Sequence, residues 1–286
     1  MSSRPEPSPA PLGDATVLLT GATEGIGRAT AVRLAPRVRA LLVHGPQDPP
    51  VVEPLVSQLR ELAGDGARVR YLQADYGRLG AVRDMAAAVE RAGERLDVLI
   101  NNAGRPGPPQ REVTADGNEV TLQTNFLAAT VLTDSLLGLL EAGEGGRIVN
   151  VASATHYSAS LELGDLGLEF HDYSGVRAYA QSKLAIVAWT AWLADRLAGR
   201  RVDVVSLHPG VISTDLLHAM FGAGGDTPDR AAANVVDAVL ARGRVNGTYF
   251  DESRPASPNP EAVVPQVQSR LMDEVARVTR RQAGEG

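Results

Sequence analysis

The sequence predicts an α/β fold, a single doubly wound domain with a mainly parallel sheet of seven strands. Short apolar runs that suit buried strands alternate with helical patterns along nearly the whole chain. This alternation is typical of a parallel sheet covered by helices on both faces. At 286 residues, 44% of them hydrophobic, the chain can bury a substantial core without a second domain.

The seven strands are expected where aliphatic residues cluster between turn residues. They are placed at residues 16–20, 40–44, 68–72, 98–100, 147–151, 202–207 and 247–250. The longest helical patterns between them cover residues 117–140 and 178–197, and both are apolar over wide arcs. Ligands of such sheets bind at the carboxyl ends of the strands, so the site is expected along that edge.

Two proline-rich segments lie outside these elements. Residues 1–11 hold four prolines and three serines and are interpreted as a disordered leader, which leaves residues 12–286 for the single domain. Residues 256–265 are also rich in proline, but they lie between the last expected strand and an amphipathic helical pattern at 266–280. They are therefore expected to form an ordered connector.

A glycine-rich turn, TGATEGIG at residues 20–27, joins the first expected strand to the first helical pattern. Gly21 and Gly25 would let the backbone approach a pyrophosphate closely, and Gly27 would let the helix pack on the strand. Free N–H groups at the helix N-terminus would favour the phosphates. A glycine turn alone could be only a loop, but between a strand and an amphipathic helix it indicates a Rossmann-type dinucleotide site. The contacts expected from it are Gly21, Thr23, Glu24, Gly25, Ile26 and Gly27.

Lys183 is the only lysine of the chain, whereas the other 27 of its 28 lysine and arginine residues are arginine. A chain so biased toward arginine is expected to keep a lysine where a compact ammonium group is needed. Tyr179 lies four residues earlier, so on a helix the phenol and the ammonium would share one face. The alternative is a solvated lysine beside a packing tyrosine.

The glycine turn and this YxxxK pair make the chain resemble the short-chain dehydrogenase/reductase family over residues 12 to about 281. Further residues of the family pattern follow in order. They are Asp75 after the third expected strand, the NNAG of residues 101–104, Asn125, Ser153 at the end of RIVNVAS, and the PGxxxT of residues 209–214.

The resemblance implies a catalytic tetrad of Asn125, Ser153, Tyr179 and Lys183. Besides the glycine turn, it implies cofactor contacts at His44, Gly45, Asp75, Tyr76, Asn102, Ala103, Gly104, Tyr179, Lys183, Pro209, Gly210, Ile212 and Thr214.

By this resemblance Tyr179 acts as general acid when a carbonyl is reduced and as general base in the reverse oxidation. A free phenol has a pKa of about 10, so the charges of Lys183 and of the oxidised nicotinamide are expected to lower it. Ser153 orients the substrate oxygen, and Asn125 holds a water that links Lys183 to solvent. Ile212 and Thr214 fix the nicotinamide ring.

Several of these residues have simpler interpretations. Asn101 and Asn102 could only make turn hydrogen bonds, and part of their role in the family is to brace the sheet. Asn125 could cap or bridge within its own helix. Asp75 could be the N-cap of the helix that begins near Leu79, alone or besides contacting the adenine. His208 is interpreted as a packed strand-end residue without a catalytic role.

The end of the second expected strand favours NADP(H), with NAD(H) as the alternative. An enzyme of this type that uses NAD(H) usually carries an acid there, which binds the ribose hydroxyls and repels a 2′-phosphate. Here Gly45 follows His44, so the repelling acid is absent. Pro46 stands where an arginine often attracts the phosphate, and Asp48 comes slightly later.

The spacing of 26 positions between Ser153 and Tyr179 exceeds that of ordinary family members. The extra residues 156–177 and the C-terminal GTYFDES resemble the retinol dehydrogenase and WW-domain oxidoreductase branch, whose members often act on lipophilic alcohols and carbonyls. An apolar substrate is therefore expected, by analogy with that branch. Residues 156–177 and 216–225 are expected to form a mobile lid, or alternatively a surface excursion packed on the body.

Composition restricts the partners. The net charge of −6 argues against nucleic acid or an anionic membrane. Cysteine is absent and the five histidines are dispersed, so no metal is expected. No secretory signal or membrane-spanning stretch is recognisable, which predicts a cytoplasmic protein. The expected substrate is a small molecule, and the long apolar helices are consistent with the homodimers or homotetramers of the family.

The predicted function is NADP(H)-dependent interconversion of a carbonyl and a primary or secondary alcohol. One alternative is a non-redox biosynthetic enzyme on the same fold, a dehydratase, isomerase or cyclase that reuses Tyr179. The other is a catalytically silent NAD(P)-sensing module. Retention of Ser153, Tyr179 and Lys183 counts against the sensing module.

Overall fold

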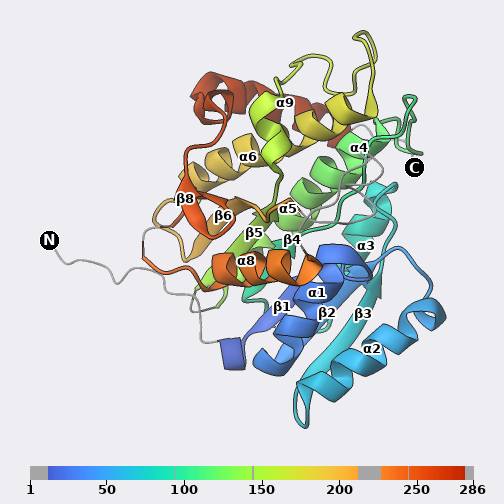
Figure 1. Ribbon diagram of the computed structural model, residues 1–286, viewed down its shortest axis with the longest axis vertical. Coiled ribbons are helices and arrows are strands. Elements are labelled where there is room, and N and C mark those ends of the chain that lie inside the picture. Colours follow the sequence, from blue (N-terminus) through green and yellow to red (C-terminus); the bar gives the residue numbers. More distant parts are fainter. Residues whose placement is uncertain (1–11, 94, 144, 212–226, 244, 281–286) are drawn as a thin grey trace, which may run out of the picture.

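The computed structural model describes residues 12–93, 95–143, 145–211, 227–243 and 245–280 (Figure 1). Within these residues, eight strands form one sheet in the order β3-β2-β1-β4-β5-β6-β7-β8. Every neighbouring pair is parallel except β7 and β8. The mainly parallel sheet is confirmed, and the leader expected at residues 1–11 lies outside the described residues.

The strands lie close to where the sequence places them. Their bounds are β1 Thr16–Leu19, β2 Ala40–Gly45, β3 Arg68–Gln73, β4 Val98–Asn101, β5 Gly146–Val151, β6 Val202–His208, β7 Tyr249–Asp251 and β8 Arg254–Ala256. The eighth strand was not expected, because three residues that include a proline carry no alternating pattern. Strands β1, β2, β4, β5 and β6 are buried along their whole length, as parallel strands between two helical layers must be.

Helices cover both faces of the sheet. Their bounds are α1 Gly25–Leu34, α2 Pro49–Ala63, α3 Leu79–Arg91, α4 Val120–Leu122, α5 Ala128–Glu141, α6 Gly175–Arg196, α8 Pro228–Leu240 and α9 Pro265–Arg280. Short helical turns lie at η1 Leu12–Asp14, η2 Ala35–Arg37, η3 Gln123–Leu127, η4 Ala154–Ser158 and η5 Pro260–Val263. Helices α1, α2 and α8 lie on one face, and α3, α5 and α6 lie on the other (Figure 1).

Two hydrophobic cores follow from the alternation of side chains along each strand. Leu18, Leu99 and Ile148 pack with residues of α3, α5 and α6. Their neighbours Val17 and Val149 belong to the core under α1, α2 and α8. Because side chains alternate with a period of two, consecutive apolar residues supply both cores. No helix among the described residues has the length and apolarity needed to cross a bilayer.

The single helix expected at residues 117–140 is interrupted. Helix α4 gives way to a π-helical turn, η3, before α5 begins at Ala128. A π-helical turn inserts one residue into the helical repeat, and such turns often occur at functional sites. Here the turn carries Asn125.

The C-terminal helix α9 packs against α6 (Figure 1). Leu271 and Val275 bury the apolar face of α9 in the core that contains α6, and Arg83 of α3 donates to the carbonyl of Thr279 at 3.0 Å. Part of the apolar surface of α6 is therefore covered by the chain itself. A dimer through the α5–α6 pair would have to use the surface that α9 leaves open.

Arg147 ties helix α8 to the sheet. It is only 1% exposed at the start of β5, and its guanidinium donates to the carbonyls of Ala238 at 3.0 Å and Ala241 at 3.1 Å. Asp203 on β6 accepts from the same guanidinium at 3.4 Å. The last turn of α8 thus gains partners for carbonyls that have none within the helix.

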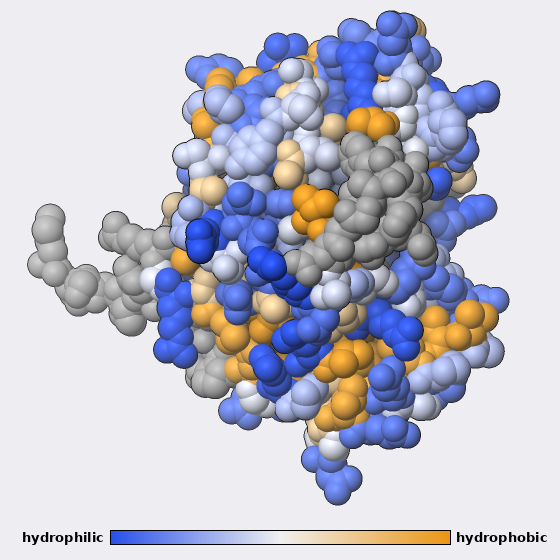
Figure 2. Space-filling view, in the orientation of Figure 1, coloured by the Kyte–Doolittle hydropathy of each residue, from blue (hydrophilic) through white to orange (hydrophobic). Residues whose placement is uncertain are grey.

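Apolar residues are scattered over the outer surface. On the face shown in Figure 2, they gather mainly over the region where α1, α2 and α8 lie in Figure 1. Val51 and Leu62 of α2 and Leu240 of α8 are among the exposed apolar side chains. Exposed apolar residues of this number are common in soluble domains.

Candidate active site

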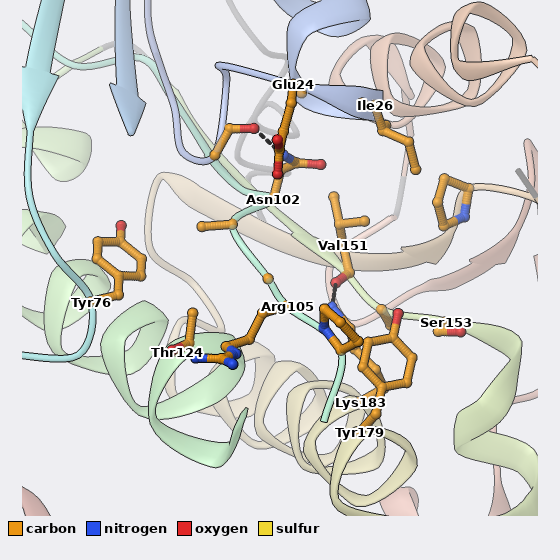
Figure 3. Close-up of a pocket in the computed structure, with 18 of the residues that line it drawn as sticks. Glu24, Ile26, Tyr76, Asn102, Arg105, Thr124, Val151, Ser153, Tyr179 and Lys183 are labelled. Carbon is orange, nitrogen blue, oxygen red and sulfur yellow. Dashed lines mark hydrogen bonds between the residues drawn. The ribbon is translucent and has the colours of Figure 1, made fainter. Parts of the chain in front are cut away.

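A cavity of about 1000 Å³ runs along the carboxyl ends of the strands. Glu24 and Ile26 of the glycine turn lie toward one end, and Ser153, Tyr179 and Lys183 lie together at the other (Figure 3). This volume is at the upper end of the range for small-molecule sites, as an extended ligand requires.

The glycine turn has the backbone geometry that its sequence predicts. Gly21 and Gly25 have positive φ angles of 63° and 51°. A Cβ on Gly21 would lie 2.6 Å from the Cα of Ala103, and one on Gly27 would lie 1.8 Å from the carbonyl oxygen of Gly21. The helix therefore starts directly against the turn, and all six residues expected to contact a dinucleotide here line the cavity.

The NNAG segment holds this turn against β4. Asn102 Nδ2 donates to the carbonyls of Thr20 at 2.9 Å and Gly21 at 3.0 Å. Asn101 Nδ2 donates to Asn150 Oδ1 at 2.9 Å and to Thr133 at 3.0 Å. Asn101 thus braces β4 against β5 and α5, while Asn102, Ala103 and Gly104 line the cavity.

His44 connects the ends of three strands. Its Nδ1 accepts from the backbone N–H of Gly21 at 3.2 Å, and its Nε2 lies 3.0 Å from the carbonyl of Ala74, to which it donates in that tautomer. The ring stacks on Tyr76 at 4.4 Å. Burial lowers the pKa of His44 to about 4, so the ring is neutral near pH 7. His44 lines the cavity and also fixes the position of Gly21.

The structure corrects the N-cap interpretation of Asp75 and places Gly45 beside the cavity lining. Asp75 is not the N-cap of α3, because Arg78 holds that position and Asp75 Oδ1 instead accepts from the N–H of Gly77 at 2.8 Å. Gly45 is not among the residues that line the cavity. A Cβ there would lie 2.5 Å from Thr23 and 2.7 Å from Gln47 Oε1, so a larger residue at this position would displace these side chains.

Tyr179 and Lys183 lie one turn apart on α6. They are 6% and 4% exposed, and Lys183 Nζ lies 5.5 Å from the centre of the Tyr179 ring (Figure 3). Lys183 Nζ donates to the carbonyl of Val151 at 3.0 Å, at the end of β5. Ser153 follows that strand, and its hydroxyl is close enough to the Tyr179 phenol to lower the pKa of Tyr179. The solvated-lysine alternative is therefore wrong.

Asn125 bridges two elements outside its own helix. Its Oδ1 accepts from the N–H of Arg105 at 2.8 Å, and its Nδ2 donates to Ser182 Oγ at 3.0 Å and to the carbonyl of Arg105 at 3.2 Å. The π-helical turn thus joins the loop after β4 to α6, next to Lys183. Bridging within the helix is excluded, and the water-holding role of Asn125 stays a prediction.

Burial dominates the titration of the site. It raises the pKa of Tyr179 to about 12, and the hydrogen bond with Ser153 lowers it in part. Burial lowers the pKa of Lys183 to about 8. In the protein alone, the cost of removing the phenolate from water outweighs the effect of Ser153, and the lowering of the Tyr179 pKa expected with the oxidised nicotinamide stays a prediction.

Residues 156–177 pack on the body of the protein. Leu161, Leu166 and Leu168 are buried. Gln181 of α6 donates to the carbonyl of Leu166 and accepts from the N–H of Glu162, both at 2.8 Å. None of residues 156–177 lines the cavity. The structure therefore favours the packed surface excursion for this segment, and the other half of the expected lid, residues 216–225, lies outside the described residues.

At the end of β6, Pro209 and Gly210 line the cavity, whereas Ile212 and Thr214 lie outside the described residues. Several lining residues were missed from the sequence. They are Pro46, Gln47, Ala74, Arg105, Pro106, Thr124, Val151, Ala152, Ala154, Thr155, His208, Val211 and Pro228. Arg105 directly follows NNAG and Thr124 directly precedes Asn125, so adjacency to the motifs was the available signal. In the part of the chain that the structure describes, no cluster of three or more acidic, histidine or cysteine side chains is arranged for a metal.

Comparison with known proteins agrees with this geometry. Residues 15–222 match the family model for short chain dehydrogenase. The chain is 34% identical to retinol dehydrogenase 13 of Mus musculus, over 95% of this chain and 86% of that protein. It is 36% identical to polyprenol dehydrogenase of Mus musculus, over 92% of this chain and 83% of that protein.

Solved structures show the same fold. A protein from Mycobacterium paratuberculosis superposes with a TM-score of 0.77 at 27% identity, covering 96% of this chain and 97% of that one. A short chain dehydrogenase from Burkholderia cenocepacia in complex with NADP superposes with a TM-score of 0.65 at 29% identity, covering 84% and 96%.

Proposed function

The chain belongs to the short-chain dehydrogenase family and is an NAD(P)-dependent oxidoreductase, and from this premise we propose its specific chemistry. It uses NADP(H) to interconvert a carbonyl and a primary or secondary alcohol on an apolar small molecule. One observation carries this proposal: the same cavity is lined by Tyr179, Lys183 and Ser153 and by the glycine turn.

The residues present fit a dinucleotide. Gly21 and Gly27 let the turn pack closely on Ala103 and on the start of α1, and all three glycines of the turn line the cavity. Helix α1 begins at Gly25, and the free N–H groups of a helix N-terminus favour a phosphate. Asn102, Ala103 and Gly104 line the middle of the cavity. When bound, the dinucleotide supplies or accepts the hydride.

Tyr179 holds the proton that the reaction needs. With a pKa of about 12 the phenol is protonated near pH 7, which suits a general acid for carbonyl reduction. Ser153 is placed to donate to the same substrate oxygen. Lys183, with a pKa of about 8, is mostly charged at pH 7 and favours the phenolate that forms as the proton leaves.

The preference for NADP(H) is supported by the end of β2, where His44 and Gly45 provide no carboxylate. Two carboxylates line the cavity, those of Glu24 in the glycine turn and of Asp75, and we expect Glu24 to oppose a 2′-phosphate. We expect a higher kcat/KM with NADPH than with NADH, and a further gain with NADPH in Glu24→Gln. Glu61→Gln, an exposed change on α2, is the control. A clear advantage for NADH in the unaltered protein would contradict the preference.

The apolar substrate is supported by the relatives, which are named for retinol and polyprenol. A panel of carbonyl compounds of increasing apolar length, with NADPH oxidation measured by absorbance, tests this. Rates should rise with apolar length and should consume one NADPH per product. Conversion of substrate without consumption of NADPH would indicate the non-redox alternative.

Assembly as a homodimer or homotetramer remains a proposal for the α5–α6 surface. Helix α9 restricts it to the part of that surface that stays open. The mass in solution, measured by light scattering, tests it, and a monomer at all concentrations would contradict it.

A further inference from the structure

His156 lies directly behind the catalytic serine. It is fully buried in η4, three residues after Ser153. The Ser153 carbonyl accepts from the backbone N–H of His156 at 3.1 Å, and the ring Nδ1 lies 2.7 Å from the same oxygen. One residue therefore holds this carbonyl through two donors.

The opposite side of the imidazole is held by a segment about a hundred residues later in the chain. The backbone N–H of Asn259 donates to His156 Nε2 at 3.2 Å. Because Nε2 accepts, Nδ1 carries the proton and donates to Ser153, so both contacts require the same neutral tautomer. Burial lowers the pKa of His156, which favours that neutral form.

Asn259 also binds the backbone of the turn that follows Ser153. Its Nδ2 donates to the carbonyls of His156 at 2.9 Å and Ala159 at 3.0 Å, and its side chain is itself nearly buried. Glu261 accepts from the N–H of Leu161 at 3.1 Å. The ordered connector expected from the proline-rich sequence is thus bonded to the loop that carries Ser153.

A core histidine kept only for packing would not need this arrangement. The ring contacts Tyr157 at 4.0 Å and Tyr249 at 4.8 Å between centroids, and a phenylalanine would fill the same space. Its polar contacts instead converge on the backbone of Ser153. The Ser153 hydroxyl also accepts from the N–H of Thr155 at 3.3 Å, so the geometry of this turn fixes where the hydroxyl points.

We propose that His156 and Asn259 are positioning residues for Ser153, so that the C-terminal segment at residues 259–261 helps to hold the catalytic serine in place. The assignment rests on the proposed function, because its effect appears through the Ser153–Tyr179 pair. If the contacts of His156 or Asn259 are lost, Ser153 can move and no longer supports the Tyr179 phenolate. A displacement of about 1 Å can cost on the order of a hundredfold in rate.

His156→Phe is the primary variant, since it keeps the ring and removes both polar contacts. We expect kcat to fall by about 10- to 100-fold while the cofactor dissociation constant is unchanged. In the oxidation direction Tyr179 must lose its proton, and Ser153 lowers the pKa of Tyr179. The rise of kcat with pH should therefore move to higher pH. The other titratable groups near His156, namely Tyr157, His208, Tyr249 and Asp251, remain in every variant.

Two further variants keep the test decisive if His156→Phe folds poorly. His156→Asn can still donate to the Ser153 carbonyl and should keep more activity than His156→Phe. Asn259→Ala should lower kcat, and its effect should be less than multiplicative with that of His156→Phe, because both act through one contact.

Gln268→Met is the matched control. Gln268 is buried in the same C-terminal region and donates to the carbonyl of Ala262 at 2.9 Å, without touching the Ser153 loop. It should lower the melting temperature without moving the pH profile. An unaltered kcat and pH profile in folded His156→Phe would overturn the positioning role. Absence of NADPH consumption by the unaltered protein would instead contradict the proposed function.

Discussion

Replacement of the only lysine by arginine should abolish most activity although the charge is retained. In Lys183→Arg the guanidinium carbon takes the place of Nζ, and the terminal nitrogens extend about 1.3 Å further. Lys183 lines the cavity, and its Nζ donates to the carbonyl of Val151 at 3.0 Å. The planar guanidinium would therefore project beyond the position of Nζ and could not keep this contact from the same point.

A displacement of about 1 Å predicts a loss in kcat on the order of a hundredfold, or about 2.7 kcal/mol in activation free energy. The assay is NADPH oxidation with the best carbonyl of the panel, alongside cofactor titration to confirm a folded site. Arg28→Lys, at an exposed position bonded to Gln58, is the matched control and should be neutral. Normal turnover by Lys183→Arg with an unshifted pH profile would refute the reasoning.

Three further predictions concern stability. Lys183→Met should raise the free energy of unfolding at pH 7 by roughly 2–3 kcal/mol, because burial lowers the pKa of Lys183 from 10.5 to about 8. Between pH 8 and pH 10.5 the unfolded chain binds more protons than the folded protein, so the stability of the unaltered protein rises with pH in this range. The stability gained by Lys183→Met should therefore vanish by about pH 10.5. A gain that is independent of pH in urea titrations would contradict this. Gly175→Ala would place a Cβ 2.2 Å from the carbonyl of Gly107 and should cost about 1–3 kcal/mol and lower kcat, whereas Gly80→Ala, with open space around it, should not. Arg147→Ala should lower the free energy of unfolding by about 3–5 kcal/mol, measured in urea. It should leave kcat of the folded protein unchanged, since Arg147 lies at the start of β5 and does not line the cavity.

The sequence predicts those features that depend on local pattern. Buried parallel strands are continuous apolar runs, so six strand positions are correct to within one residue at each end. The glycine turn is recognisable because its conformation needs glycine at Gly21 and Gly25, where φ is positive. The pairing of Tyr179 with Lys183 follows from helical spacing alone.

Features that depend on contacts between distant segments cannot be predicted from the local sequence pattern. The role of His156 depends on Asn259, which lies 103 positions later. The π-helical turn at Asn125 is fixed by partners on other elements, Arg105 and Ser182, and not by its own residues. The pKa of Tyr179 is set by burial, which neither spacing nor composition reports.

The central claim is that Tyr179 transfers the proton in a redox reaction. Its most direct test is the rate of NADPH oxidation by Tyr179→Phe and by the unaltered protein, with the same carbonyl substrate and with cofactor affinity measured for both. The ring is kept, so the cofactor should bind equally well, and kcat should fall by about a hundred- to ten-thousandfold because the proton donor is gone. Turnover by Tyr179→Phe at the rate of the unaltered protein would contradict the claim.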